Sequence, residues 1–378
     1  MSLTRRRFMQ SVGAGAAGSL FAPALAGRGL EALAAGDRRA LTANAIRLNS
    51  NENPDGPGRA ALDGIAQQLS EASRYPFGVI DSLRAATATA LGIAPGNILL
   101  TCGSTDILRA SVYAFTSPTA ALVTGRPSFE SPGEDAAVVG APVHAVPLTA
   151  DLHLDLPAML AVSRGAGLIY LCNPNNPTAT VHGADAVKDF IAAVLKDSPQ
   201  TTILVDEAYH EYVEDPRYAT MIPLAMANPR VLVARTFSKV YGLAGLRVGY
   251  AVAQPATLAA MERHTLQIGV NQLGAAAALA SLGDRDHIQR ERARNRDARE
   301  FTRSALAAAG YPAGVSDANF IMVDVRRDTK QFAAACRDHG VLVGRPFPPL
   351  SSYSRISVGT ADEMRTAVDV FRRVLATA

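Results

Sequence analysis

The chain has 378 residues, of which 48% are hydrophobic and 19% charged, and its formal net charge is +3. This length allows two or three domains, or one large domain with a smaller one, and the composition is ordinary for a globular enzyme. No basic run occurs after the N-terminus, which argues against a nucleic-acid-binding surface. Three scattered cysteines exclude a disulfide framework, and the seven histidines show no metal-ligand spacing, so we predict no metal site.

The N-terminus has the layout of an export signal. Residues 4–10 read TRRRFMQ, and an uncharged stretch rich in alanine and glycine follows from 11 to 26, ending in Ala-Leu-Ala. Paired arginines, an apolar run and a small-residue cleavage site in this order predict a twin-arginine signal peptide and a periplasmic or otherwise exported protein. The stretch is too weakly apolar to predict a stable membrane span. The alternative is a cytoplasmic protein with a basic N-terminus.

The segment after the signal contains few regular elements. Residues 27–44 form a polar, alanine-rich arm, and residues 46–59 (IRLNSNENPDGPGR) form a loop with several carboxamides and turn residues. A helix is expected over 60–73, and the sequence Arg-Tyr-Pro at 74–76 ends it.

The middle of the chain alternates short apolar runs with longer amphipathic stretches, which predicts an α/β fold with a mostly parallel central sheet between helices. The expected strands are 98–102, 120–124, 143–146, 168–172, 202–206, 231–236 and 248–252. The expected helices are 105–115, 131–139, 184–196 and 255–264. Ligands of such sheets bind at the carboxyl ends of strands, where Gly103, Asn173, Asp206 and Lys239 fall.

The C-terminal part predicts a smaller α+β domain. Residues 271–310 form a long helical region, and strands at 320–325, 341–343 and 355–358 alternate with helices at 330–339 and 361–375. We therefore expect four parts. They are the signal at 1–26, an arm with part of the small domain at 27–75, a large domain at 76–270, and a connecting helix with the small domain at 271–378.

One stretch, 231–250 (VLVARTFSKVYGLAGLRVGY), carries the chemical prediction. A buried strand leads to Lys239 among the hydroxyls of Thr236 and Ser238, and Arg247 follows. A lysine amine can bond to an aldehyde, while hydroxyls and a guanidinium hold a phosphate. Pyridoxal phosphate has both groups and attaches to lysine as a Schiff base. By itself the stretch could also be a surface Ser-Lys turn with a structural arginine.

Further motifs decide between these interpretations. They are TCGSTDI at 101–107, an aromatic in PSF at 127–129, LCNPNNPT at 171–178, TTILVDEAYHEY at 201–212 and LNSNENPDGP at 48–57. Together with SKVYGLAGLRVGY they resemble the fold type I pyridoxal-phosphate aminotransferases, and among these the histidinol-phosphate aminotransferases. The resemblance runs from about residue 46 to about residue 360.

The resemblance implies roles for the cofactor site. Lys239 would form the Schiff base and act as the general base, and Asp206 would pair with the pyridine nitrogen. Asn176 and Tyr209 would bond the phenolic oxygen, and Phe129 would stack on the ring, although core packing also explains a phenylalanine there. The phosphate would be held by residues at a helix start and in the lysine turn, namely Ser104, Thr105, Thr236, Ser238 and Arg247.

The resemblance also implies a substrate site and an assembly. Arg355 would bind the carboxylate of amino-acid and 2-oxo-acid substrates, with Asn53 and Asp55 nearby. Tyr75 would reach the phosphate of a neighbouring subunit, which implies a homodimer with shared active sites.

Two departures from the histidinol-phosphate pattern bear on the substrate. Asp55 stands where a tyrosine is usual, and an acid there would repel a phosphate unless it is a turn residue facing solvent. Arg345 lies one place after the position where the family often has an arginine. Histidinol phosphate therefore remains an alternative to other amino donors. A lyase, decarboxylase or oxidase could use the same lysine and acid, and a solute-binding protein is an alternative of another class.

Overall fold

The computed structural model describes residues 45–376, and the predicted signal and arm lie outside them. Eleven strands are found in this part of the chain. They are β1 (Ile46–Leu48), β2 (Ile98–Thr101), β3 (Leu122–Arg126), β4 (Val143–Pro147), β5 (Leu168–Cys172), β6 (Thr202–Asp206), β7 (Val231–Thr236), β8 (Gly249–Val252), β9 (Phe320–Asp324), β10 (Val341–Val343) and β11 (Tyr353–Ser357).

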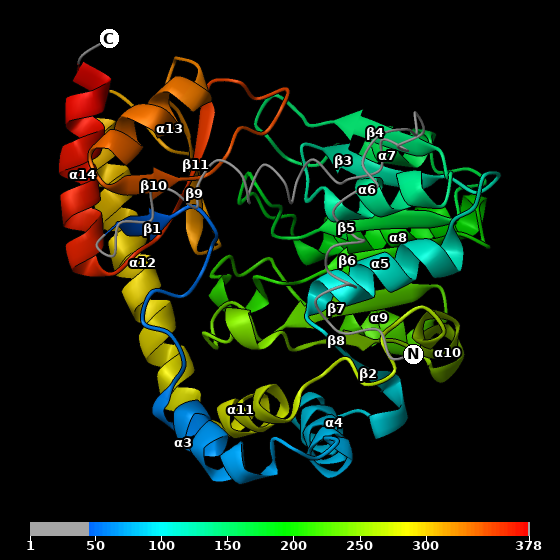
Figure 1. Cartoon of the computed structure of the whole chain (residues 1–378). Coiled ribbons are helices and arrows are strands. Elements are labelled where there is room, and N and C mark those ends of the chain that lie inside the picture. The colour runs from blue at the N-terminus through cyan, green and yellow to red at the C-terminus, as the bar shows by residue number, and fades with distance from the viewer. Residues whose placement is uncertain (1–44, 377–378) are drawn as a thin grey trace, which may run out of the picture. The chain divides into compact units, whose positions relative to one another are not determined.

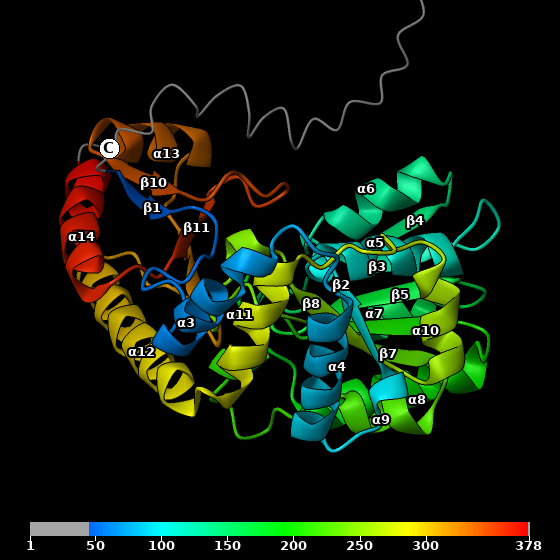
Figure 2. The same ribbon diagram turned by 60° about the horizontal axis from the view of Figure 1, so that its bottom comes forward.

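The helices of the described residues lie between and around these strands (Figures 1 and 2). They are α3 (Arg59–Gln68), α4 (Phe77–Leu91), α5 (Ser104–Phe115), α6 (Ser131–Val138), α7 (Leu156–Ala161), α8 (Ala184–Asp197), α9 (Ile222–Ala227), α10 (Pro255–Glu262), α11 (Gln272–Gly283), α12 (Arg285–Ala308), α13 (Thr329–Asp338) and α14 (Ala361–Ala376). Short 3-10 turns occupy Leu69–Glu71, Pro95–Asn97, His210–Tyr212 and Ala244–Leu246.

A central sheet has the strand order β2-β8-β7-β6-β5-β3-β4, and all its neighbouring pairs are parallel except the two that involve β8. Its strands are apolar on both faces. Leu168, Tyr170 and Cys172 pack in the cluster of α5, α6 and α10, whereas Ile169 and Leu171 pack in the cluster of α7, α8 and α9. The predicted α/β class with a mostly parallel sheet is confirmed.

A second group of elements, which we call the C-terminal lobe, contains β1, β9–β11 and α12–α14. Here β1 pairs parallel with β10, and β11 pairs antiparallel with β9. The lobe has its own apolar cluster, in which Leu48 of β1 packs with residues of α12–α14. Figure 1 shows the blue β1 among the orange and red elements of the lobe, so the two ends of the described chain meet there.

Several expected boundaries are wrong. The loop expected at 46–59 begins with β1, and the expected strand 120–124 starts two residues later because Ala120 closes a turn with Ser117. The long helical region at 271–310 is two helices. Asp284 separates them, since its backbone is not helical and its carboxylate accepts the amide of His287 at 3.0 Å to cap α12. Helices α4, α7 and α9 were not predicted.

Candidate active site

The predicted chemical residues gather where parallel strands of the central sheet end. Asp206 is the last residue of β6 and lies opposite Ala234 of the adjacent β7. Lys239 follows β7 after one short turn, and Gly103 follows β2 at the start of α5. The carboxyl edge of the sheet therefore brings an acid, an amine and a helix N-terminus together, as the strand pattern predicts.

Lys239 is held with its amine inside the protein. Its Nζ donates to the backbone oxygen of Asn51 at 3.1 Å and lies 5.5 Å from the centre of the Tyr209 ring. Burial, and then the positive charge of Arg355, lower the pKa of Lys239 to about 8. The amine is thus more readily neutral than an ordinary lysine, which is the state that attacks a carbonyl.

Asp206 is a buried acid without a cationic partner in direct contact among the described residues. Its Oδ2 accepts from the Tyr170 hydroxyl at 2.9 Å, and its Oδ1 accepts from the Ala208 amide at 3.1 Å. Burial raises the pKa of Asp206 to about 6, although these hydrogen bonds and the Lys239 charge oppose that rise. A positively charged ring nitrogen beside Asp206 would compensate the buried negative charge of its carboxylate.

An anion cradle lies at the start of α5. Gly103 has φ +73°, and a Cβ there would collide with the guanidinium of Arg247, whose Cζ would be 2.8 Å away. The first amides of α5 have no partner within the helix, and no side chain caps them. Free amides, a guanidinium and hydroxyls converge here, and they belong to Ser104, Thr105, Thr236, Ser238 and Arg247.

The cradle is pre-formed by its own contacts. Thr236 donates to the Ser238 hydroxyl at 2.9 Å, and the Ser238 amide donates back to Thr236 at 3.0 Å. Arg247 has a left-handed backbone with φ 55° and donates to the carbonyl of Ala244 at 3.1 Å. A phosphate fits this set of donors without any change of fold.

Arg355 supplies a second anion site on β11 of the C-terminal lobe. Its guanidinium donates to Asn176 Oδ1 and to the carbonyl of Asn49, each at 2.7 Å, while its buried Nε has no partner. Its Cζ lies 4.9 Å from the Phe347 ring centre and 5.7 Å from that of Phe320. Burial lowers the pKa of Arg355 to about 10, so an anionic ligand would relieve an unfavourable buried charge.

Asn51 joins these parts, and it was not among the predicted site residues. It has φ 54°, and its side chain donates to the Tyr209 hydroxyl at 3.1 Å and accepts from Ser357 at 2.8 Å. Its backbone carbonyl accepts hydrogen bonds from the side chains of Lys239 and Asn319. The crowded carboxamides of residues 49–53 were the only signal in the sequence that could have indicated this role.

The remaining predicted residues have the following contacts with other parts of the protein. Asn53 bonds the carbonyl of Val240 at 3.0 Å and so positions the lysine turn. Asp55 is half exposed, and its carboxylate lies 3.5 Å from Arg294. Phe129 packs partly buried on the cluster under α5. Tyr75 is 74% exposed and packs on Phe77, so within one chain it does not join the site.

An ion pair between Arg345 of the C-terminal lobe and Glu130, at the start of α6, links the two parts of the molecule. Arg345 donates to both oxygens of Glu130, one of them at 3.1 Å from Nη1. The Arg345 guanidinium also lies 4.4 Å from the Phe347 ring centre, against which Arg355 packs as well. Arg345 thus connects the segment that follows Phe129 with the surroundings of Arg355.

The residues present fit pyridoxal phosphate. The amine, the buried acid and the cradle that only a glycine leaves open match its aldehyde, ring nitrogen and phosphate. Among residues 45–376, no group of three or more histidine, cysteine or acidic side chains could hold a metal ion.

Comparisons with known proteins agree with this geometry. Residues 43–371 match the profile of the family described as aminotransferase class I and II. The chain is 36% identical over 371 residues to histidinol-phosphate aminotransferase 1 of Nitrosococcus oceani, covering 97% of this chain and 98% of that protein. It is also 36% identical to an aromatic amino acid aminotransferase of Thermobifida fusca, covering 86% of this chain and 89% of that protein.

A solved structure is similar over nearly the whole chain. Histidinol-phosphate aminotransferase of Sinorhizobium meliloti in complex with pyridoxal-5′-phosphate superposes with a TM-score of 0.86 at 31% identity, covering 96% of this chain and 99% of that one. The chain therefore belongs to the family of class I and class II aminotransferases. The predicted transaminase activity and the fold type I architecture are confirmed at this level.

Proposed function

We propose that the protein moves an amino group between an amino acid, or a related amine, and a 2-oxo acid by a ping-pong mechanism. The observation that carries the proposal is the placement of the Lys239 amine and the Asp206 carboxylate at the ends of adjacent strands, next to the cradle of Gly103 and Arg247. Bound pyridoxal phosphate supplies an aldehyde that takes the amino group and a ring that accepts electrons from the substrate Cα.

The chain's own groups perform the remaining tasks. The Lys239 amine, whose pKa burial lowers to about 8, would serve as the base that takes the proton from the substrate Cα. Asp206 holds a proton on the ring nitrogen, and the donors at the start of α5 fix the phosphate. Arg355 would orient the substrate through its anionic group, because an anion beside it would compensate a guanidinium whose pKa burial lowers to about 10.

The choice of amino donor belongs to this proposal as well. Asp55 is paired with Arg294, so its charge is no longer a strong argument against a phosphate-bearing donor. Arg345 is likewise paired with Glu130, so the second candidate is supported by the relatives: proteins named histidinol-phosphate aminotransferase and aromatic amino acid aminotransferase are each 36% identical to this chain.

The test is a half-reaction screen of the cofactor-loaded protein. Amino acids, basic and aromatic ones included, and histidinol phosphate are added singly, and the loss of the yellow absorbance band is followed. We expect bleaching with an amino donor and recovery of the band with a 2-oxo acid. A protein that stays colourless with pyridoxal phosphate, or a band that no amine bleaches, would contradict the proposal.

The proposal includes a homodimer. Aromatic and aliphatic side chains with more than 40% exposure occur near α3, α4 and α11, among them Leu69, Tyr75, Phe77, Leu266 and Ile268. Such surfaces in a folded protein mark contacts with other chains. We expect a dimer in sedimentation experiments, and Tyr75→Ala should weaken cofactor binding in the dimer; a monomer with full activity would refute this.

The proposal also includes export through the signal at 1–26. Residues 45–376 contain no helix long and apolar enough to cross a membrane. The order of arginines, apolar run and cleavage pattern supports transport of the folded protein out of the cytoplasm. Fractionation of cells that express the double variant Arg5→Lys/Arg6→Lys tests this, because an unchanged location would rule it out.

A further inference from the structure

A cavity of about 620 Å³ is lined by residues other than those assigned to the active site. One wall is formed by segments that extend from the central sheet, including Asp151, His153 and residues 178–181. The other wall comes from the C-terminal lobe and includes Met322, Asp324 and Tyr353. The size is within the range of about 300 to 1,000 Å³ that is usual for small-molecule sites.

The cavity shares a sheet face with Arg355 but lies beyond it. In the antiparallel pair of β9 and β11, Met322 is opposite Arg355 and Asp324 is opposite Tyr353. Side chains two residues apart point to the same face of a strand, so this face carries Arg355 at the active site and Asp324 with Tyr353 in the cavity. Thr178, on the other wall, is bonded to Asn175 at 2.9 Å.

The cavity lining is acidic. It contains four aspartates and two arginines, which gives a formal charge of −2 with histidine neutral. Both arginines already have partners, and the partner of Arg217 belongs to the same lining. Arg217 binds Asp215, and Arg326 donates to the carbonyl of Gly310 and lies over the Tyr311 ring.

The other three aspartates of the lining have no lysine or arginine side chain as a partner among the described residues, and Asp324 accepts from the backbone amide of Arg326 at 2.9 Å. Asp151 contacts only His153 as an ion pair. Asp317 is 7% exposed, and its one protein donor is the Glu214 amide, at 2.9 Å on Oδ1. An ammonium group beside such a carboxylate would add the positive partner that the described residues do not supply.

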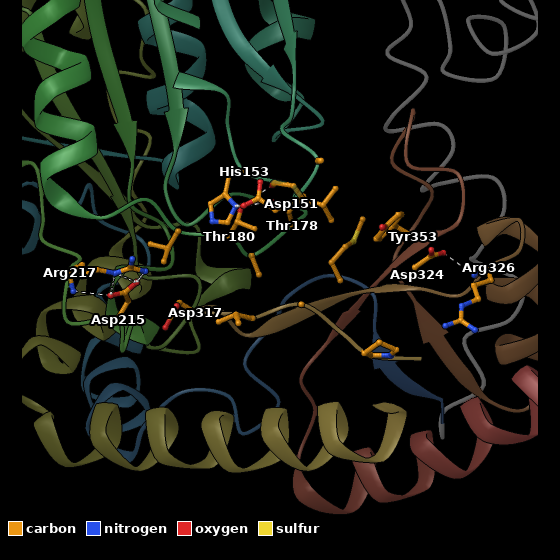
Figure 3. A pocket seen from close by; sticks show the side chains of 18 residues that line it. Asp151, His153, Thr178, Thr180, Asp215, Arg217, Asp317, Asp324, Arg326 and Tyr353 are labelled. Carbon is orange, nitrogen blue, oxygen red and sulfur yellow. Dashed lines mark hydrogen bonds and ion pairs between the residues drawn. The ribbon is translucent and has the colours of Figure 1, made fainter. Parts of the chain in front are cut away.

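The carboxylates are spread along the cavity rather than clustered. Figure 3 shows Asp317 beside Asp215 on one side and Asp324 beside Tyr353 on the other. Leu152, Pro312, Val315 and Met322 contribute apolar surface to the lining. This is the pattern that recognises a chain of methylenes with a positive charge at each end.

We propose that this cavity binds a linear aliphatic di- or polyamine. One ammonium group would lie at Asp317 and the other at Asp324, with the methylenes against the apolar lining. The site is separate from the amine-reactive Lys239 and does not depend on the proposed transamination.

The test is calorimetric titration of the cofactor-loaded protein with spermidine and with 1,5-diaminopentane, compared with the monoamine pentylamine. The titrations are repeated on Lys239→Ala, in which amine chemistry at the active site is removed. We expect one site per chain, binding of the diamine at least about tenfold tighter than the monoamine, and the same affinity in Lys239→Ala.

Two variants locate the site. Asp324→Asn keeps the acceptor for the Arg326 amide and should weaken spermidine binding about tenfold, whereas the matched control Asp338→Asn, an exposed acid on α13, should leave it unchanged. Equal affinities in these two variants would overturn the proposal. Amine binding that disappears in Lys239→Ala would also overturn it, while the half-reaction test of the transaminase would be unaffected.

Discussion

Two consecutive acids at the end of β6 differ completely in how their charges are compensated. Glu207 is 1% exposed and accepts from Arg235 Nε at 3.0 Å and Nη2 at 2.8 Å, with Thr220 and the Met221 amide as further donors. Asp206 is 4% exposed and accepts only from a neutral phenol and one amide. Alternation along the strand sends the two carboxylates in different directions.

The difference separates groups that hold the fold from groups kept for a ligand. The Glu207–Arg235 pair is complete within the protein, so nothing about it calls for another charge. Asp206, Lys239 and Arg355 are buried, incompletely compensated and close together, and burial is the first cause of each of their pKa shifts. Such groups mark functional sites because the missing partner is supplied by cofactor or substrate.

The largest expected effect is the loss of the amine. Lys239→Ala should lower the rate of amino transfer by about 10⁴-fold or more, since one group both bonds the cofactor and moves the proton. Circular dichroism and the urea midpoint should stay as in the wild type. Residual turnover near the wild-type rate would show that another amine does the chemistry.

The second expected effect falls on stability. Glu207→Gln leaves the Arg235 guanidinium buried without its anion and should lower the free energy of unfolding by about 3 to 5 kcal/mol. Urea unfolding of the cofactor-free protein measures this. As a control, Glu207→Gln combined with Arg235→Met should recover much of the loss. If Glu207→Gln alone were as stable as the wild type, the claim that Glu207, unlike Asp206, stabilises the fold would be wrong.

The third expected effect is on activity and not on stability. Asp206→Asn should lower kcat by about 10² to 10³-fold, because the ring nitrogen loses its negative partner. In the cofactor-free protein the same change should not lower the free energy of unfolding, since it removes a buried charge without a counterion. A loss of stability as large as that of Glu207→Gln would mean that Asp206 serves the fold.

The smallest effect is in the pH dependence of stability. The pKa of Asp206 is raised to about 6 from its ordinary 3.8, so between these values the folded state holds more protons than the unfolded state. The Asp206 contribution to stability therefore falls as pH rises from about 4 to about 6, by up to about 3 kcal/mol. The difference between wild type and Asp206→Asn, measured by urea unfolding across this range without cofactor, should show that fall; a constant difference would contradict it.

The sequence predicted those parts of the site that follow directly from strands. Asp206 and Lys239 each come at or just after an apolar β-branched run, and continuous burial of these runs, which is typical of parallel strands, is enough to place both residues at one edge of the sheet. The helix α4 was missed because Pro76 was taken only as the end of the preceding helix, whereas the structure has it as the residue before a new one. The strand β1 is only three residues long, with a charged residue in the middle.

The rest depends on contacts between distant segments. Asn51 meets Ser357 across 306 positions, and Arg345 meets Glu130 across 215. No local pattern records such pairs, so the sequence gives carboxamides and arginines but not their partners. Asp55 shows the same limit, because its interpretation as a substrate-facing charge depended on Arg294, a residue of α12 whose direction could not be known.

The pairing of β1 with β10 sets a limit on how far the chain can be shortened from its amino terminus. Ile46 at the start of β1 lies opposite Val341 of β10, and Asn51 follows five positions later. Proteolysis from the amino terminus should therefore be tolerated only as far as that strand. Cutting further would detach the segment that carries Asn51 and inactivate the enzyme, so the shortest active form should begin close to Ile46.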